Sequence, residues 1–265
     1  MTQQAVEGFR AERAEILALA KSLSDDEWMQ PSACAGWTIR DVMGHMACTL
    51  HGVIDPAFLP NRDGGTEASM EPAVAERRAW PIEDVLAEYE TYSEQAANVF
   101  ASVQDAPLAD TMLDMGDLGT HPMSILPAVF LFDGYTHLRV DILAPRGSIE
   151  RPAPPRDDKR LRPTVEWMLA GLPWMCEDAL RGVVDRPMVL VLDGPGGGTW
   201  TIAPGADDGR VQVDEGAASD AAATVRSTDH DFVIWGTQRV PWTELTKVEG
   251  DEAYATKILD AINII

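Results

Sequence analysis

Apolar residues recur at helical spacing in four separate stretches of the first 145 residues. The first stretch, AVEGFRAERAEILALAKSLSDDEW, places four apolar residues on one face: Phe9, Ile16, Ala20 and Leu23. The second runs from about Thr38 to Ile54 and begins with a capping signal formed by Thr38 and Asp41. The third begins near Pro81, and the fourth covers about residues 124–143. Four long helices joined by loops predict an antiparallel four-helix bundle.

The pattern changes after residue 145. The segment APRGSIERPAPPRDD is rich in proline and charge, which is typical of a linker. One more helix, at about Leu161 to Arg181, precedes four short apolar runs closed by turn residues: MVLVLDG, GTWTIAPG, RVQVDEG and AATVRST. DHDFVIWGTQR and GDEAYATKILDAINII are typical of helices. The sequence therefore predicts a bundle over residues 1–145, a linker over 146–158 and a smaller α+β domain with an antiparallel sheet over 159–265.

Composition restricts the classes of partner. Apolar residues make up 45% of the 265 residues, which is enough for packed cores. The formal net charge of -22 argues against nucleic acid and anionic membranes as partners. The three cysteines form no CxxC motif, which argues against a disulfide framework and a cysteine-based zinc site. With no signal-peptide core or membrane-length apolar run, we expect a cytoplasmic protein.

Two ionisable residues interrupt the apolar face of the fourth predicted helix. Asp133 and His137 lie one helical turn apart, on the side that should face the core. Burying an unpaired carboxylate costs several kcal/mol, so such groups are usually paired or bound to a metal. A structural hydrogen bond between Asp133 and His137 is one interpretation, and a pair of metal ligands is the other.

His45 in the second predicted helix offers a third donor. It lies at the edge of the apolar stripe of that helix, beside Val42 and Thr49. Two histidines and one carboxylate from neighbouring helices suit zinc, nickel or iron(II), with positions left open for water or substrate. The sequence thus makes His45, Asp133 and His137 a candidate metal site, although a lone histidine at position 45 would more often be a core histidine.

Other polar residues give weaker signals. His51 is nearly two turns from His45, and we expect it on the surface. Asp141 could orient His137, but we expect it to cap the surface end of its helix. Cys48 is interpreted as core packing rather than as a nucleophile. His121 receives no assignment. The GPGGG segment lies between two predicted strands, which indicates a hairpin loop rather than a phosphate-binding loop.

Two segments resemble the mycothiol-dependent maleylpyruvate isomerase family. DDEWMQPSACAGWTIRDVMGHM is similar to the family's opening signature, and FDGYTHLRVDILAPRG is similar to its second metal-binding segment. The matching signature residues are Trp28, Pro31, Ser32, Cys34, Gly36, Trp37, Arg40, Asp41 and His45. The resemblance implies a DinB-like bundle over about residues 1–145 and a sterol-carrier-like C-terminal domain.

The resemblance also implies roles for single residues. The family's metal ligands fall on His45, Asp133 and His137, and Asp133 departs from the glutamate of the characterised isomerase. The isomerase takes an arginine from its C-terminal domain into the active site. Arg239 and Arg226 are the positions that we expect to supply it here.

The implied chemistry uses a divalent metal, zinc by preference, and mycothiol as a small-molecule thiol. A thiol bound to a divalent cation loses its proton near neutral pH and attacks an electrophilic substrate. The thiol then leaves after isomerisation or stays attached after transfer. Metal-assisted hydrolysis with the same ligands and non-catalytic binding of an apolar ligand are the alternatives. We expect the loop DPAFLPNRDGGTEASMEP to set specificity.

Overall fold

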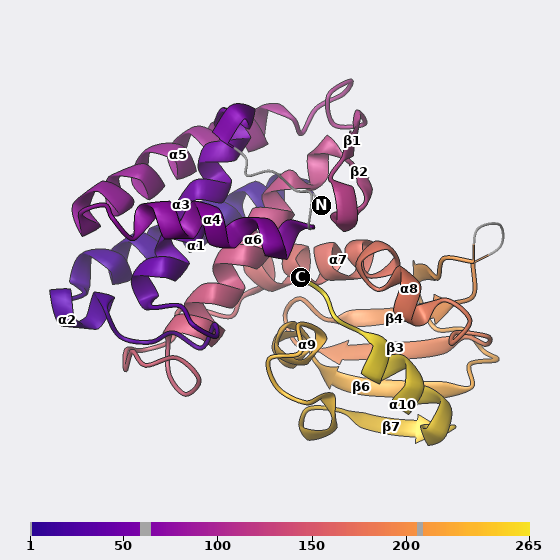
Figure 1. Ribbon diagram of the computed structural model, residues 1–265. Coiled ribbons are helices and arrows are strands. Elements are labelled where there is room, and N and C mark those ends of the chain that lie inside the picture. The colour runs from indigo at the N-terminus through magenta and orange to yellow at the C-terminus, as the bar shows by residue number, and fades with distance from the viewer. Residues whose placement is uncertain (1, 59–64, 206–208) are drawn as a thin grey trace. The chain divides into compact units, whose positions relative to one another are not determined.

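The chain forms two compact units. The computed structural model describes residues 2–58, 65–205 and 209–265 (Figure 1). One unit contains Met1–Gly116 and Thr120–Pro155, and the other contains Asp117–Gly119 and Arg156–Ile265. The predicted fold class, a helical bundle with a smaller α+β part, is confirmed.

The N-terminal unit is a bundle of four helical segments. They are α1 (Thr2–Ser22), α3 (Ile39–Ile54), α5 (Ile82–Ser102) and α6 (Leu126–Thr136), the last continued by the π-helix η4 (His137–Ile142). α1 packs on α5 and α6, and α3 packs on α5 (Figure 1). The predicted second and third helices are therefore confirmed.

Local sequence explains where two of these helices begin and how they pack. The Thr38 side chain accepts a hydrogen bond from the Asp41 amide, and the Asp41 side chain accepts one from the Thr38 amide, which forms a capping box. Pro127 lies in the first turn of α6, where its missing N–H costs no hydrogen bond. Nearly every residue of α6 is buried, as expected for a helix that is apolar on all sides.

Several short elements of the N-terminal unit differ from the predictions. The first predicted helix divides into α1 and α2 (Asp25–Trp28), because Ser24 forms a new capping box with Glu27. The loop predicted over residues 56–70 contains η1 (Pro56–Phe58) and the beginning of α4 (Thr66–Arg77), while residues 59–64 lie outside the described part. α4 was missed because its sequence, TEASMEPAVAER, holds Pro72 and few apolar residues. A small hairpin and a 3-10 turn precede α6: β1 (Met112–Asp114), β2 (Thr120–Pro122) and η3 (Met123–Ile125).

The C-terminal unit combines helices with one five-stranded sheet. Its helices are α7 (Asp158–Met175), α8 (Glu177–Leu180), α9 (Asp229–Gly236), η5 (Trp242–Glu244) and α10 (Glu252–Ala261). Its strands are β3 (Met188–Asp193), β4 (Gly198–Ala203), β5 (Gln212–Glu215), β6 (Ala223–Thr228) and β7 (Lys247–Gly250). α7, α9 and α10 pack against the sheet. A further short turn, η2 (Gly116–Leu118), lies where the chain passes from the N-terminal unit into the C-terminal unit.

The sheet has the order β5-β4-β3-β6-β7. Three pairings are antiparallel, whereas β3 and β6 run parallel. Four of its strands match the predicted runs, but β7 was not predicted. The GPGGG segment is the β3–β4 hairpin loop, as expected. Its Gly194 has a φ of 131°, and a Cβ there would lie 2.4 Å from an Asp229 carboxylate oxygen, so only glycine fits.

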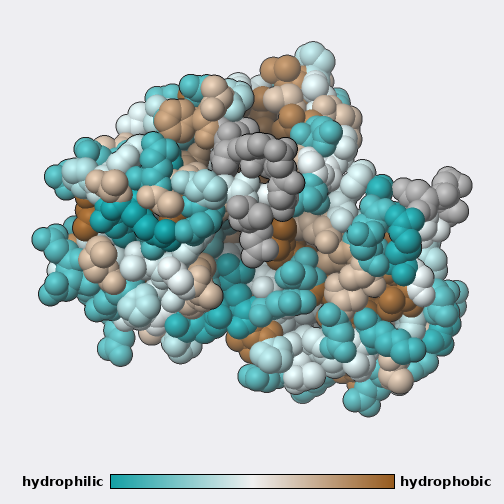
Figure 2. All heavy atoms as spheres, in the orientation of Figure 1, coloured by the Kyte–Doolittle hydropathy of each residue, from teal (hydrophilic) through white to brown (hydrophobic). Residues whose placement is uncertain are grey.

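Hydrophilic residues dominate the face of the protein that Figure 2 shows. On the face shown in Figure 2, apolar residues appear as small separate groups among hydrophilic ones. This pattern agrees with a strongly acidic chain whose carboxylates are solvated. Within the described residues, no helix is both long enough and apolar enough to cross a membrane.

Candidate metal centre

The structure brings His45, Asp133 and His137 together inside the N-terminal unit. His45 lies on α3, Asp133 lies on α6, and His137 is the first residue of the π-helix. Asp133 Oδ1 lies 3.1 Å from His45 Nε2 and 3.3 Å from His137 Nε2. The three donor atoms all lie within 4.8 Å of one another. The two imidazole rings pack edge to face with centroids 5.0 Å apart.

These distances fit a shared divalent cation. Ligand atoms held about 2.0–2.2 Å from one ion in a tetrahedral arrangement lie about 3.3–3.6 Å from each other. The two Asp133 contacts, at 3.1 and 3.3 Å, are close to that spacing and longer than charge-assisted hydrogen bonds of about 2.7–2.9 Å. The side chain of Asp133 keeps 26% of its surface exposed, so a small molecule can approach the donors. Three protein donors with one open side are typical of catalytic rather than structural zinc sites.

Charge within the cluster shifts two pKa values in opposite directions. Burial acts to raise the pKa of Asp133, but the charges and hydrogen bonds of His45 and His137 outweigh it and hold that pKa far below its usual range. Burial acts to lower the pKa of His137, but the charge of Asp133 and hydrogen bonds to Asp133, Asp141 and Cys34 raise it well above 6.5. Both shifts favour an ionised Asp133 beside a protonated His137.

Asp141 orients His137, and our expectation that it caps the helix at the surface is wrong. Its side chain is 1% exposed, and its Oδ2 lies 2.9 Å from His137 Nδ1. The π-helix keeps Asp141 buried, and the backbone amide of Ala33 donates to the Asp141 carbonyl oxygen at 2.8 Å. Arg146 Nη1 approaches the other carboxylate oxygen at 3.3 Å. A carboxylate on the far nitrogen of a histidine fixes its tautomer and directs the near nitrogen to a metal.

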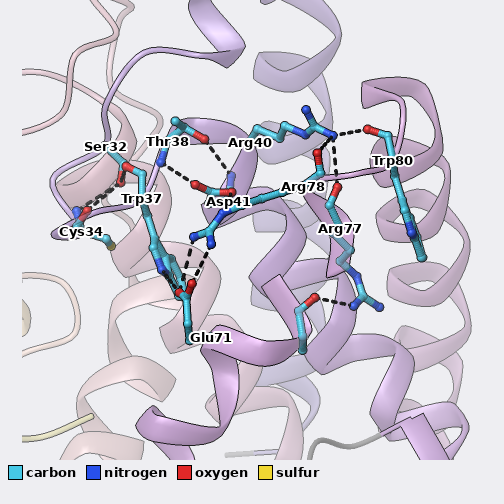
Figure 3. A network of polar contacts seen from close by, with 11 residues as sticks. Ser32, Cys34, Trp37, Thr38, Arg40, Asp41, Glu71, Arg77, Arg78 and Trp80 are labelled. Atoms are coloured by element: carbon cyan, nitrogen blue, oxygen red, sulfur yellow. Dashed lines mark hydrogen bonds and ion pairs between the residues drawn. The ribbon is translucent and has the colours of Figure 1, made fainter. Parts of the chain in front are cut away.

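The loop between α2 and α3 adds two neighbours that sequence reasoning did not place at the site. Cys34 Sγ lies 3.8 Å from His137 Nδ1, and the Trp37 ring lies 5.5 Å from the His45 ring between centroids. Both residues belong to the signature segment, and this feature of the sequence could have indicated that they lie near His45 and His137. The turn itself is held by Ser32, whose hydroxyl donates to the Trp37 carbonyl oxygen at 2.9 Å (Figure 3).

Cys34, His137 and Asp141 form a second group of possible ligand atoms. In this group the nitrogen of His137 is Nδ1, which is already hydrogen-bonded to Asp141. One imidazole nitrogen cannot both donate to a carboxylate and bind a cation. We therefore interpret this group as the support for His137 and the first group as the candidate metal centre.

The remaining candidates of the N-terminal unit are buried. His51 is buried, which contradicts our expectation of a surface position, because Phe58 and Tyr92 stack on its two faces. Cys48 is 1% exposed, as expected for core packing, and burial raises the pKa of its thiol to about 12. His121 is also buried, in β2.

Arg226 and Arg239 both belong to the C-terminal unit. Arg226 lies on the exposed face of β6, with its Nε 3.4 Å from Glu249 Oε1. Arg239 follows α9 and is half-buried, and its amide donates to the Ile234 carbonyl oxygen at 3.0 Å. Their role at a metal centre stays a prediction.

Comparisons with known proteins agree with the sequence resemblance. Residues 9–129 match the sequence model of the mycothiol maleylpyruvate isomerase N-terminal domain. The crystal structure of the mycothiol-dependent maleylpyruvate isomerase superimposes with a TM-score of 0.53 at 11% identity, covering 94% of this chain and 93% of that one. A mutant of the same enzyme gives a TM-score of 0.50 at 10% identity, with the same coverage. Comparison with curated proteins gives no match.

At these identities the structural comparison shows a shared fold. The sequence match over residues 9–129 agrees with the resemblance that the signature segment suggested. Residues 9–129 are thus similar to the mycothiol maleylpyruvate isomerase N-terminal domain, and the chain has the fold of the mycothiol-dependent maleylpyruvate isomerase.

Proposed function

We propose that the protein is a metal-dependent enzyme that uses mycothiol as the nucleophile for isomerisation of, or transfer to, a small electrophilic substrate. The observation that carries the proposal is the close grouping of His45 Nε2, Asp133 Oδ1 and His137 Nε2. The family of the N-terminal domain and the shared fold support the choice of thiol and of reaction class.

Some residues of the chain would bind the ion, and another would orient one of these ligands. His45, Asp133 and His137 would hold a divalent cation, zinc by preference, and the same donors also suit nickel and iron(II). When bound, such a cation lowers the pKa of a coordinated thiol towards neutrality. Asp141 would accept a hydrogen bond from His137 Nδ1 and so leave the lone pair of Nε2 available to the ion.

The cysteines of the chain support the use of an external thiol. Burial raises the pKa of Cys48 to about 12 and also raises that of Cys176, so neither forms a thiolate readily. Cys34 contacts Nδ1 of His137, whereas the donor atoms of the candidate centre use Nε2. We therefore propose that the reacting thiol comes from a small molecule.

Arg226 and Arg239 are the residues that we propose for binding an anionic group of the substrate. A guanidinium group binds carboxylates through paired hydrogen bonds, and maleylpyruvate, the substrate of the relative with this fold, carries carboxylates. Whichever of the two arginines binds the substrate, its replacement with alanine should lower kcat/KM and leave the metal content unchanged. Maleylpyruvate is accordingly the first substrate to assay.

Elemental analysis of the purified protein, followed by calorimetry with mycothiol, tests the proposal. We expect about one divalent ion per chain, lost in His45→Ala, and heat of mycothiol binding that disappears in Asp133→Ala. Asp105→Ala is the matched control, because it removes an exposed carboxylate from the same unit. It should leave both the metal content and the heat unchanged.

Other outcomes separate the alternatives. If the wild-type protein holds no stoichiometric metal and His45→Ala changes neither metal content nor stability, the enzyme proposal fails and an apolar ligand-binding role gains support. If metal is present but mycothiol gives no heat, the thiol mechanism fails, and hydrolytic substrates should then be assayed.

A further inference from the structure

The two histidines of the metal centre are supported in different ways. His137 has Asp141 on its Nδ1 at 2.9 Å, which is the usual device for orienting a metal-binding imidazole. His45 Nδ1 is buried and has no hydrogen-bond partner among the described residues. Apart from the contact of its Nε2 with Asp133 at 3.1 Å, the ring of His45 is therefore held by packing.

Trp37 supplies that packing. Its ring centroid lies 5.5 Å from that of His45 at an interplanar angle of 46°, within the range of favourable aromatic contacts. His137 contacts the same imidazole edge to face. The His45 ring therefore has an aromatic neighbour in Trp37 and another in its fellow ligand, and the position of the indole matters for the position of Nε2.

The backbone of Trp37 is fixed by its own loop. Its amide donates to the Cys34 carbonyl oxygen at 3.0 Å, and its carbonyl oxygen accepts from the Ser32 amide at 2.9 Å. The Ser32 hydroxyl adds a second hydrogen bond to that carbonyl oxygen (Figure 3). These contacts fix the chain at Trp37 but leave the rotation of its indole to the side-chain partners.

A chain of polar contacts fixes the indole (Figure 3). Trp37 Nε1 donates to Glu71 Oε2 at 2.8 Å. Arg78 Nη1 holds the other Glu71 oxygen at 2.6 Å, and Arg78 Nε donates to Asp41 Oδ1 at 3.0 Å. Asp41 is buried in the capping box with Thr38, the residue that follows Trp37. The contacts therefore form a closed ring that begins and ends in the same loop.

The Glu71–Arg78 ion pair of this ring contributes little to the stability of the fold. The side chains of Glu71 and Arg78 are 55% and 38% exposed, and exposed ion pairs contribute about 0–1 kcal/mol. Hydrogen bonds from Arg78 and Trp37 lower the pKa of Glu71, so its carboxylate stays ionised and continues to accept the indole N–H. Arg40 performs the structural task instead, because its Nη2 caps the end of α4 by donating to the Arg77, Arg78 and Trp80 carbonyl oxygens.

We propose that Trp37 is the positioning residue for His45 and that Glu71 acts through it by fixing the indole. Trp37 thus orients His45 by packing, as Asp141 orients His137 by a hydrogen bond. The inference deepens the proposed function, on whose metal centre it rests, but it makes no use of the thiol.

Cobalt(II) titration of the metal-free protein provides the test. The affinity and the visible absorption bands of bound Co²⁺ report the geometry of the ligands directly. We expect Glu71→Ala to weaken Co²⁺ binding about 3- to 10-fold, the range of one aromatic contact, and to shift the bands. Glu71→Gln keeps an acceptor for the indole and should recover part of the affinity. Trp37→Ala should weaken binding at least as much as Glu71→Ala.

Glu76→Ala is the matched control, because it removes an exposed carboxylate from the same helix without touching Trp37. It should match the wild type in affinity and spectrum, and all variants except Trp37→Ala should keep the wild-type melting temperature. Wild-type affinity and bands in Glu71→Ala would overturn the proposal, as would an equal loss in Glu76→Ala. If mycothiol does not bind to the wild type, the thiol mechanism alone is contradicted, because the cobalt titration tests the role of Trp37 independently of the thiol.

Discussion

Two clusters in the same bundle both pair histidine with a carboxylate, yet one of them resembles a metal centre and the other does not. In the ligand cluster, His45 and His137 share Asp133 at 3.1 and 3.3 Å. In the arginine cluster, His51 lies 2.8 Å from Glu88, whose carboxylate also accepts two hydrogen bonds from Arg77.

The difference lies in the positive charge. Arg77 is a permanent cation, so Glu88 is neutralised and its oxygens are occupied without any ion. Among the described residues, the ion-pair partners of Asp133 are His45 and His137, and these can give up their protons to make room for a metal. The arrangement of charge, rather than the presence of histidine and carboxylate alone, separates a structural cluster from a candidate metal site.

Removing the cation from the arginine cluster should give the largest effect. Arg77→Met would leave Glu88 buried without its permanent cation, and we expect a loss of about 3–5 kcal/mol in the free energy of unfolding. Urea unfolding measures it. Lys21→Met, which breaks an exposed ion pair with Glu90 in the same unit, should cost less than about 1 kcal/mol. Adding Glu88→Gln to Arg77→Met should recover part of the loss, and similar losses in Arg77→Met and Lys21→Met would contradict the comparison.

Removing the support of the ligand cluster should instead affect metal binding. Asp141→Asn takes away the carboxylate that fixes the tautomer of His137, and we expect metal affinity to fall about 10- to 100-fold. Competition with a chromophoric chelator measures this change. The same substitution should leave the arginine cluster, and hence most of the stability, intact. An unchanged affinity would show that His137 needs no support from Asp141.

The next largest effect that we expect is a dependence of metal binding at the ligand cluster on pH. In the metal-free protein the raised pKa of His137 means that its ion pair with Asp133 stabilises the fold at low pH and is lost as pH rises through that pKa. A metal must displace this proton, so its affinity should rise with pH, by up to about tenfold per unit below the pKa of His137. Melting temperatures with and without zinc, measured across the neutral range, check the sign. A metal-induced shift that shrinks as pH rises would contradict it.

The sequence was most informative where local chemistry decides the outcome. The capping pair Thr38 and Asp41 predicted where α3 begins, and helical spacing placed Asp133 and His137 on one face. Spacing and the signature together brought His45 to the same site. Each of these inferences depends on neighbours within one helical turn or on a recognisable segment.

Features that depend on tertiary packing were missed. The π-helix that keeps Asp141 buried changes the hydrogen-bond register, which apolar periodicity does not reveal. His51 was expected at the surface, because nothing near it in sequence indicates that Phe58 and Tyr92 cover it. The place of Trp37 beside His45 depends on a loop folding back over its own helix.

The smallest expected effect concerns the one ligand that departs from the family pattern. Asp133→Glu introduces the glutamate that the resemblance implies. The longer side chain must bend to keep its oxygen near two nitrogens that already lie 3.1 and 3.3 Å from the aspartate. Since the donor type is unchanged, we expect less than about tenfold loss of metal affinity, below the effect of losing Asp141.

The spectrum of Co²⁺ in Asp133→Glu should nevertheless shift, because the carboxylate approaches from a different angle. Asp105→Glu, which lengthens an exposed carboxylate in the same unit, is the control. If Asp133→Glu bound metal more tightly than the wild type and left activity unchanged, the shorter ligand would be a neutral variation of the family. If it kept the metal but lost activity, the reach of Asp133 would be part of what sets the chemistry of this chain apart from that of the isomerase.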